Sequence, residues 1–144
     1  MELVRKLQKR IDDGNPIAVG IVGCGQMGSG LAHTINNVDG MTIRSIADID
    51  PQRGISTFHE MGIDEQQIVV TESASEGEDA IRNGKYLVTP DAMMVTSLEG
   101  IEANVEATGV TDIGARIAYN SILNRKPVIM LNVETDITVG YYLN

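Results

Sequence analysis

The residues of this sequence whose types and spacing point most directly to chemistry are three glycines near its start. Gly23, Gly25 and Gly28 form the pattern G-x-G-x-x-G, which follows a short apolar run and precedes a segment with helical spacing. In such a strand–turn–helix unit the first glycine makes a tight turn, the second lets the backbone approach a pyrophosphate, and the third lets helix and strand pack closely. The N–H groups and dipole at the start of the helix favour phosphates. The pattern predicts a dinucleotide site, although glycine turns that bind no ligand are also common.

A carboxylate at the end of the next expected strand strengthens this interpretation. Asp48 lies 25 residues after Gly23, near the separation of about 20 at which an acidic residue accepts hydrogen bonds from the adenosine ribose. The alternative is that Asp48 only caps the strand end or shapes the turn. An acid here repels a 2′-phosphate, whereas Arg53, shortly after it, is placed to pair with one. We expect NAD or NADP as cofactor, with a slight preference for NAD.

Two polar segments follow later expected strands. Thr108 and Gly109 come directly after the expected strand 103–107, and Asn132 and Glu134 come after the next strand. Ligands of open α/β sheets bind at the carboxyl ends of the strands, so these residues would line the nicotinamide ribose side and the approach to a substrate. The competing interpretation is purely structural, a turn and a helix cap.

The histidines and the cysteine are weaker candidates. His33 and His59 lie on expected helices, and neither has a partner at the spacing of a metal site, so we expect no metal centre. Cys24 lies inside the glycine-rich turn, where a helix N-terminus can raise thiol reactivity. The more ordinary interpretation of Cys24 is a small side chain that fills space.

The elements that must position these residues alternate along the chain. Strands alternating with helices indicate βαβ crossovers and a parallel sheet. We expect an α/β fold with a Rossmann-type doubly wound, mostly parallel sheet in three layers, which stops after about its fifth main strand. In the less regular middle, 68–70 is a strand fragment or an anchored loop, and 72–77 is a small polar stretch. The expected strands are 17–22, 42–47, 86–88, 103–107 and 127–131, and the expected helices are 2–12, 27–38, 52–61, 78–83, one starting at Pro90, and 111–124.

Length and composition limit the class of protein. A chain of 144 residues suits one domain, and we expect residues 1–144 to form a single NAD(P)-binding domain, an N-terminal fragment of a longer enzyme. Eleven basic and twenty acidic residues give a net charge of −9, and 3% aromatic residues offer few stacking platforms, which argues against nucleic-acid binding. No apolar run reaches the ~18 residues of a membrane span, and no secretory signal is visible. With its single cysteine, the chain fits a reducing compartment, and we expect a cytoplasmic protein.

Three longer stretches resemble a known family. VGIVGCGQMGSGL, SIADIDPQR and VEATGVTDIGARIAYNSILNRKPVIMLNVETDITVG look like the NAD(P)-binding domain of predicted homoserine dehydrogenases that carry a C-terminal SAF domain. The same broad group contains reductoisomerase-like oxidoreductases, and the resemblance covers nearly the whole chain from about Pro16. It implies pyrophosphate binding by Gly23, Gly25, Gln26, Met27 and Gly28, adenosine ribose binding by Asp48, nicotinamide contacts by Thr108 and Gly109, and an edge facing substrate at Asn132 and Glu134.

One residue departs from the family pattern. Ordinary homoserine dehydrogenases have a lysine that takes part in catalysis directly after the asparagine that matches Asn132, and this chain has Val133 there. The resemblance therefore does not imply homoserine itself as the substrate. The substrate-binding and SAF regions of the family have no counterpart in this sequence, so no catalytic residue is predicted.

The leading hypothesis is the NAD(P)-binding domain of an oxidoreductase that transfers hydride between nicotinamide and a small hydroxy or keto compound. As an isolated domain it would be inactive. The alternatives are an NADPH-dependent reductoisomerase domain and a non-catalytic nucleotide-sensing module. We also expect a homo-oligomer, because apolar surface around the final VGYYLN would lie uncovered.

Overall fold

The structure is built around one sheet of six strands in the order β3-β4-β2-β1-β5-β6, and every neighbouring pair is parallel. The computed structural model describes residues 1–143. The chain order reverses at β1, which has β2 on one side and β5 on the other, so the expected doubly wound α/β fold is confirmed. The strands are β1 (Ile17–Val22), β2 (Met41–Ala47), β3 (Ile68–Val70), β4 (Tyr86–Thr89), β5 (Ala103–Glu106) and β6 (Val128–Met130).

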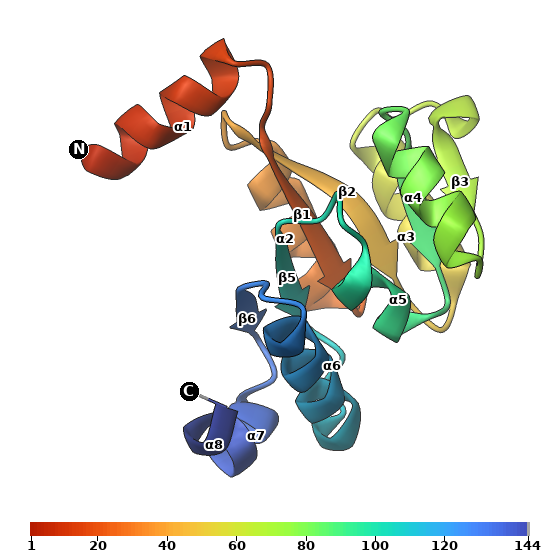
Figure 1. Cartoon of the computed structure of the whole chain (residues 1–144). Coiled ribbons are helices and arrows are strands. Elements are labelled where there is room, and N and C mark those ends of the chain that lie inside the picture. The colour runs from red at the N-terminus through yellow and green to blue at the C-terminus, as the bar shows by residue number, and fades with distance from the viewer. Residues whose placement is uncertain (144) are drawn as a thin grey trace.

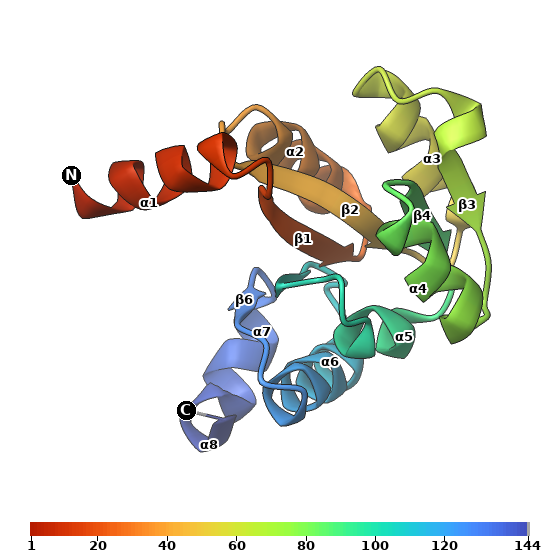
Figure 2. The same ribbon diagram turned by 45° about the horizontal axis from the view of Figure 1, so that its top comes forward.

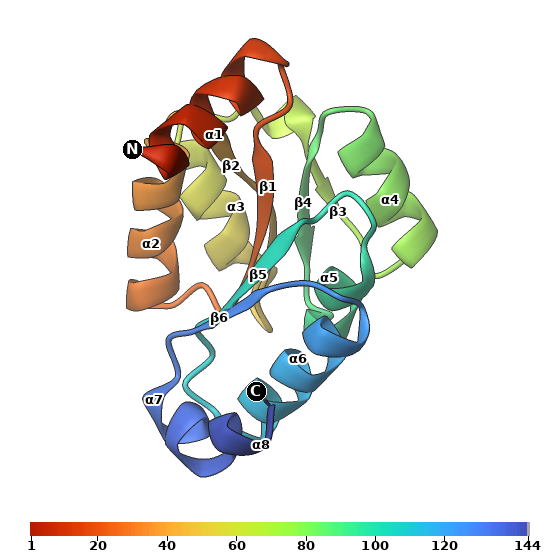
Figure 3. The same ribbon diagram turned by 60° about the vertical axis from the view of Figure 1, so that its left-hand side comes forward.

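Helices cover both faces of the sheet (Figures 1 and 3). On one face α2 and α3 pack against β1, β2 and β4, and on the other α4, α5 and α6 pack against β4, β1, β2, β5 and β6. The expected three layers are therefore present. The helices are α1 (Glu2–Asp12), α2 (Gln26–Asn36), α3 (Pro51–Glu60), α4 (Ala74–Arg82), α5 (Ala92–Ser97), α6 (Thr111–Leu123), α7 (Val133–Thr135) and α8 (Tyr141–Leu143), with a 3₁₀ turn η1 (Glu65–Gln67) and a π-helical turn η2 (Asp136–Gly140).

The core follows from the alternation of side chains along β1. Val19 and Ile21 pack in the cluster that includes residues of α2 and α3, whereas Val22 packs in a cluster with α5 and α6. Because helices lie on both faces, the strand is apolar on both sides and reads as a continuous apolar run. The composition of β1 thus matches its position inside the sheet, between β2 and β5.

The middle of the chain differs from the expectation in one place. The segment 72–77 was expected to be a polar stretch before a helix at 78–83, but α4 begins at Ala74. Ser73 is the N-cap, and its side chain accepts a hydrogen bond from the backbone N–H of Glu76, which is a standard way to start a helix. The ambiguous segment 68–70 is a strand, since β3 pairs with β4 at the sheet edge.

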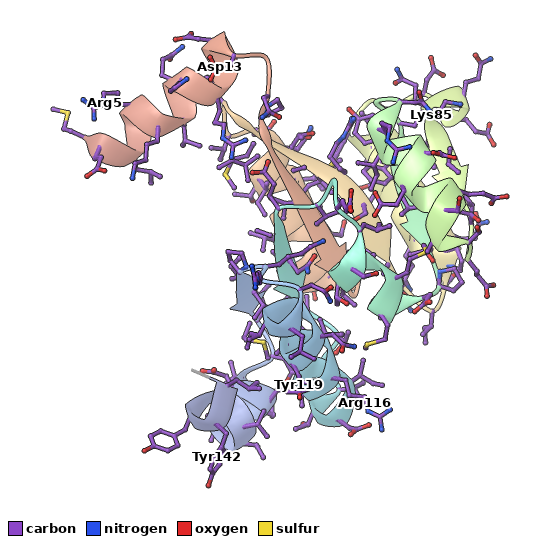
Figure 4. The ribbon with its side chains drawn as sticks, viewed as in Figure 1. Arg5, Asp13, Lys85, Arg116, Tyr119 and Tyr142 are labelled. Carbon is purple, nitrogen blue, oxygen red and sulfur yellow. The ribbon has the colours of Figure 1, made fainter. Side chains whose placement is uncertain are left out.

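The two ends of the chain lie outside the three layers. Helix α1 extends away from the sheet (Figure 2), buries none of its residues, and is tied to the body by an ion pair between Arg10 and Glu102. At the other end α7, η2 and α8 follow β6, and Tyr142 points outward (Figure 4). Within residues 1–143 no helix has both the length and the apolar character to cross a membrane.

Candidate functional site

The glycine turn between β1 and α2 is shaped by two close approaches. Gly23 has a φ of +91°, and a Cβ there would lie 2.6 Å from the backbone of Ala107 at the end of β5. A Cβ on Gly28 would lie 1.9 Å from the carbonyl oxygen of Gly23. Gly25, in contrast, has no atom within 4 Å of the place where a Cβ would be. The fold therefore requires Gly23 and Gly28, whereas Gly25 leaves open space.

The start of α2 faces that open space. Gly25 is its N-cap, and no side chain within the described residues caps the helix. Gln26 and Met27 follow in the first turn, and Met27 is 63% exposed. The first N–H groups of a helix have no partner inside it and attract anions. The predicted pyrophosphate position at Gly25, Gln26 and Met27 is therefore sterically open and electrostatically suitable.

Asp48 connects this turn to the end of β2. Its side chain is 6% exposed, and Oδ2 accepts a hydrogen bond of 2.7 Å from the backbone N–H of Cys24. Oδ1 accepts a second one of 2.9 Å from the N–H of Asp50. The turn-shaping role of Asp48 is therefore observed. Because a carboxylate oxygen can accept more than one hydrogen bond, Asp48 keeps capacity for a ribose hydroxyl, and that role stays a prediction.

A pocket of about 210 Å³ opens beside this arrangement, at the carboxyl ends of β1, β2, β4 and β5. Asp48 and Thr108 both contribute to its wall, and so does Arg53, whose side chain is 57% exposed. The Arg53 Nη1 lies 3.9 Å from Asp48 Oδ1, and its Nε lies 3.8 Å from Asp50 Oδ2. The pocket is lined by Val22, Gly23, Gly25, Ala47, Asp48, Ile49, Arg53, Pro90, Ala92, Ala107, Thr108, Val110 and Ile113.

The turn after β5 depends on Glu106, a residue that the sequence alone did not single out. Gly109 has a φ of +69°, which favours glycine. The N–H and the hydroxyl of Thr108 both donate to Oε1 of Glu106, at 2.8 Å and 2.5 Å. Glu106 is fully buried at the end of β5. An acidic residue within a strand expected to be buried is the signal that could have revealed it, since buried acids are rare unless they have partners.

The segment after β6 is not part of the pocket wall. Asn132 is 3% exposed and caps α7, with its Oδ1 accepting a hydrogen bond of 3.2 Å from the N–H of Thr135. Glu134 is exposed to solvent. The helix-cap interpretation of this segment is thus observed, and neither residue lines the pocket that holds Asp48 and Thr108. A contact of Asn132 or Glu134 with substrate remains a prediction.

Cys24 and the two histidines show no reactive arrangement. Burial raises the pKa of the Cys24 thiol, and a contact of 3.2 Å with the Thr57 hydroxyl only partly offsets this. The thiol is therefore neutral at pH 7, as a space-filling side chain would be. His33 lies 3.1 Å from a carboxylate oxygen of Glu60. In the described part of the chain no three His, Cys, Asp or Glu side chains are grouped to hold a metal ion.

A larger cavity of about 670 Å³ lies at the opposite edge, near the amino ends of β1, β2 and β4. One of its walls is Arg44, whose guanidinium lies 4.9 Å from the Tyr86 ring centre and donates to the Gly84 carbonyl oxygen at 3.0 Å. Ligands of doubly wound sheets bind at the carboxyl ends of the strands, where the order reverses. We therefore assign the candidate site to the smaller pocket, where the glycine turn and Asp48 meet.

Comparison with known proteins finds the same fold in solved structures. No family model and no curated protein sequence matches this chain. Scyllo-inositol dehydrogenase from Lactobacillus casei with bound NAD(H) and scyllo-inositol is similar with a TM-score of 0.60 and 15% identity, over 89% of this chain and 34% of that one. An oxidoreductase from Agrobacterium radiobacter in complex with NAD+, L-tartaric acid and magnesium has a TM-score of 0.58 and 18% identity, over 81% and 27%. A mutant 3-ketoreductase from Actinomadura kijaniata in complex with TDP-benzene and NADP has a TM-score of 0.55 and 14% identity, over 81% and 30%.

The chain spans about a third or less of the length of these structures, namely 34%, 27% and 30%. Identities of 14–18% between sequences that share a sheet topology are evidence of common architecture rather than common activity. What the comparison establishes for this chain is a Rossmann-type α/β fold, the fold of dinucleotide-binding domains.

Proposed function

We propose that this chain is the NAD(P)-binding domain of an oxidoreductase, which transfers hydride between the nicotinamide and a small hydroxy or keto compound. The observation that carries the proposal is the meeting of Gly25, the uncapped start of α2 and Asp48 around one pocket at the carboxyl edge of the sheet. Solved structures of similar fold that hold NAD(H) or NADP support it. The protein would bind and orient the cofactor, which itself supplies the hydride chemistry.

The charges around the pocket favour NAD over NADP. Arg53 is the basic residue in the wall, and its guanidinium lies within 4 Å of two carboxylates, at 3.9 Å from Asp48 and 3.8 Å from Asp50. These carboxylates repel a 2′-phosphate and reduce the positive potential that Arg53 can offer to it. A buried carboxylate with spare acceptor capacity is, in contrast, suited to the ribose hydroxyls of NAD.

We further propose that the chain belongs to a longer enzyme of the homoserine dehydrogenase-like kind. The resemblance of its three long stretches to that family supports this, and so does the greater length of the solved structures with the same fold. Val133, where homoserine dehydrogenases have lysine, favours a substrate other than homoserine. The alternative is an NADPH-dependent reductoisomerase, in which Arg53 of the pocket wall would pair with the 2′-phosphate.

Isothermal titration with NAD+, NADH, NADP+ and NADPH tests the proposal, using the wild type and Asp48→Asn. We expect NAD(H) to bind more tightly than NADP(H), and the variant to lose at least about tenfold in NAD(H) affinity, since a hydrogen bond to a charged group contributes about 1.5–3 kcal/mol. Asparagine is preferred to alanine because its carbonyl oxygen can still accept a hydrogen bond from Cys24 or Asp50. Asp39→Asn, an exposed acid at the other end of β2, is the matched control.

Two results would change the interpretation. A preference for NADP(H) that survives Asp48→Asn and disappears in Arg53→Met would favour the reductoisomerase alternative. If none of the four nucleotides binds the wild type at millimolar concentration, the proposed function is wrong, and the glycine turn serves only the fold.

A further inference from the structure

A buried polar cluster of Glu106, Asn132 and Thr135 lies next to the Thr108–Gly109 turn. Glu106 is fully buried, and both of its hydrogen bonds from Thr108 end on one oxygen, Oε1. The other oxygen, Oε2, has no hydrogen-bond partner within residues 1–143. Leaving a buried carboxylate oxygen without a partner costs free energy. Natural proteins tolerate such costs mainly at functional sites, so Glu106 requires an explanation beyond the stability of the fold.

Helix α6 and the segment after β6 pack against the Glu106 carboxylate. A Cβ on Gly114, in the first turns of α6, would lie 2.8 Å from Glu106 Oε2 and 2.9 Å from Asn132 Nδ2. It would also lie 2.6 Å from the Thr135 hydroxyl, which donates to the carbonyl oxygen of Thr111. Asn132 Nδ2 likewise has no partner among the described residues. Gly114 thus leaves the space that the Glu106 carboxylate occupies, and a methyl group there would push against Oε2.

The Glu106 carboxylate holds the backbone that forms one wall of the pocket. Thr108 donates from both its N–H and its hydroxyl to Glu106, and the same hydroxyl oxygen accepts from the N–H of Val110 at 3.3 Å. Val110 is the N-cap of α6. The hydrogen bonds therefore run from Glu106 through Thr108 to the start of α6, across the left-handed turn at Gly109.

The position of Thr108 in the sheet indicates which half of a dinucleotide it would face. Asp48 lies after β2, on one side of the central strand β1, and Thr108 lies after β5, on its other side. In a doubly wound sheet the two halves of a dinucleotide bind on the two sides of the reversal point. With the adenosine ribose at Asp48, the nicotinamide half falls at Thr108.

We propose that Glu106 is a positioning residue for the nicotinamide half of the cofactor, which it places by fixing Thr108 in the pocket wall. The inference rests on the proposed function and deepens it. Glu106 itself does not line the pocket, so it touches neither the cofactor nor the reacting atoms. Its effect is to select one conformation of the Thr108–Gly109 turn before the cofactor arrives, which lowers the ordering cost of binding.

The test compares NADH with ADP, which lacks both the nicotinamide and its ribose. Isothermal titration of the full chain would use the wild type, Glu106→Met, which removes the acceptor at similar volume, and Glu106→Gln, which keeps one oxygen for Thr108. We expect Glu106→Met to weaken NADH binding about tenfold and ADP binding less than about twofold, since tenfold is the effect of one net hydrogen bond of ordinary strength. Glu106→Gln should bind NADH more nearly as the wild type does.

Two further variants complete the design. Glu102→Met removes an acid just before the amino end of the same strand, where Glu102 pairs with Arg10, and should leave both affinities unchanged. Gly114→Ala keeps the carboxylate but pushes against its Oε2, and should reproduce the selective loss of NADH affinity. Near-UV circular dichroism checks that each variant is folded. If Glu106→Met is not folded, the affinities of Gly114→Ala and Glu106→Gln are compared instead.

The outcomes separate this inference from the proposed function. If the wild type binds neither ligand, the proposed function fails and the positioning role fails with it. If the wild type binds both ligands, but the Glu106 and Gly114 variants change the two affinities by the same factor or leave both unchanged, Glu106 serves only the fold. A loss of affinity for NADH alone, together with unchanged affinities in Glu102→Met, supports the positioning role.

Discussion

Cys24 lies within the turn that would face the phosphates, yet its side chain belongs to the core. It packs in the same cluster as Ala32 of α2 and Phe58 of α3, and it is 4% exposed. Burial raises the pKa of its thiol, whereas reactive cysteines are partly exposed and have a lowered pKa. The cysteine therefore contributes packing beneath the turn, and the backbone of the turn is left to contact a ligand.

The raised thiol pKa predicts a loss of stability at alkaline pH. Below the ordinary cysteine pKa both the folded and the unfolded chain keep the proton, so Cys24 causes no pH dependence. Above it the unfolded chain releases the proton while the folded chain retains it, which favours unfolding by about 1.4 kcal/mol per pH unit at most. Urea denaturation of the wild type and Cys24→Ala between pH 7 and pH 10 should show curves that diverge only at the alkaline end. Parallel curves would mean that the thiolate is accommodated in the folded state.

The turn and the first part of α2 act as one element, in which three glycines have different tasks. Gly28→Ala would place a Cβ 1.9 Å from the carbonyl oxygen of Gly23, and we expect a loss of about 1–3 kcal/mol in the free energy of unfolding. Gly25→Ala meets no atom within 4 Å and should change stability by less than about 0.5 kcal/mol. If the proposed site is correct, the same variant blocks the pyrophosphate and lowers NADH affinity at least tenfold.

Gly30→Ala is the matched control for these two variants. Gly30 lies on α2 with nothing within 4 Å of the Cβ position, so alanine should stabilise the helix by about 0.5–1 kcal/mol. It should leave NADH binding unchanged. Thermal unfolding and NADH titration of the three variants together separate the demands of the fold from those of a ligand. Equal NADH affinity of Gly25→Ala and Gly30→Ala would contradict the pyrophosphate position.

Elements with strong local patterns could be predicted from the sequence, and elements that depend on distant neighbours could not. The unit from β1 through α2 to β2 was placed to within two residues at each of its boundaries, because a buried strand and a glycine turn leave local marks. The strand β3 has three residues and exists through its pairing with β4, which no local pattern encodes. The start of α4 was missed although Ser73 and Glu76 have the spacing of a helix cap.

In the candidate site, too, the residues with a local sequence pattern could be predicted and those that depend on distant contacts could not. The glycine turn and Asp48 were identified because their spacing is characteristic, and the pocket brings Gly25, Asp48, Arg53 and Thr108 together. Glu106 was missed because hydrophobic periodicity treats an acid inside a strand as a flaw in the pattern. Its hydrogen bonds to Thr108 become visible only when the turn after β5 is folded. Buried polar groups of this kind are the part of a site that spacing alone does not reveal.

At the scale of the whole molecule, apolar side chains remain exposed at both ends of the chain. On α1, Leu3 and Val4 are each 68% exposed, but ion pairs from Lys6 to Glu2 and from Lys9 to Asp13 keep that helix well solvated. At the other end, the apolar residues follow β6, which is an edge strand of the sheet. The exposed fractions there are 61% for Val133, 79% for Ile137, 87% for Tyr141 and 82% for Tyr142.

We predict that the chain self-associates through this second surface. Contiguous exposed apolar residues beside an edge strand are features that promote contact between copies. Sedimentation velocity should therefore show a concentration-dependent dimer at tens of micromolar, a range in which weak interfaces of about 6–7 kcal/mol become populated. Ile137→Ser combined with Tyr141→Ser should return the chain to a monomer, because it removes apolar area without touching the core. Leu3→Ser combined with Val4→Ser removes a similar exposed area from α1 and should leave the dimer intact. A wild type that sediments as a monomer at every concentration, or a dimer that only the α1 variant abolishes, would show that the surface after β6 does not drive association.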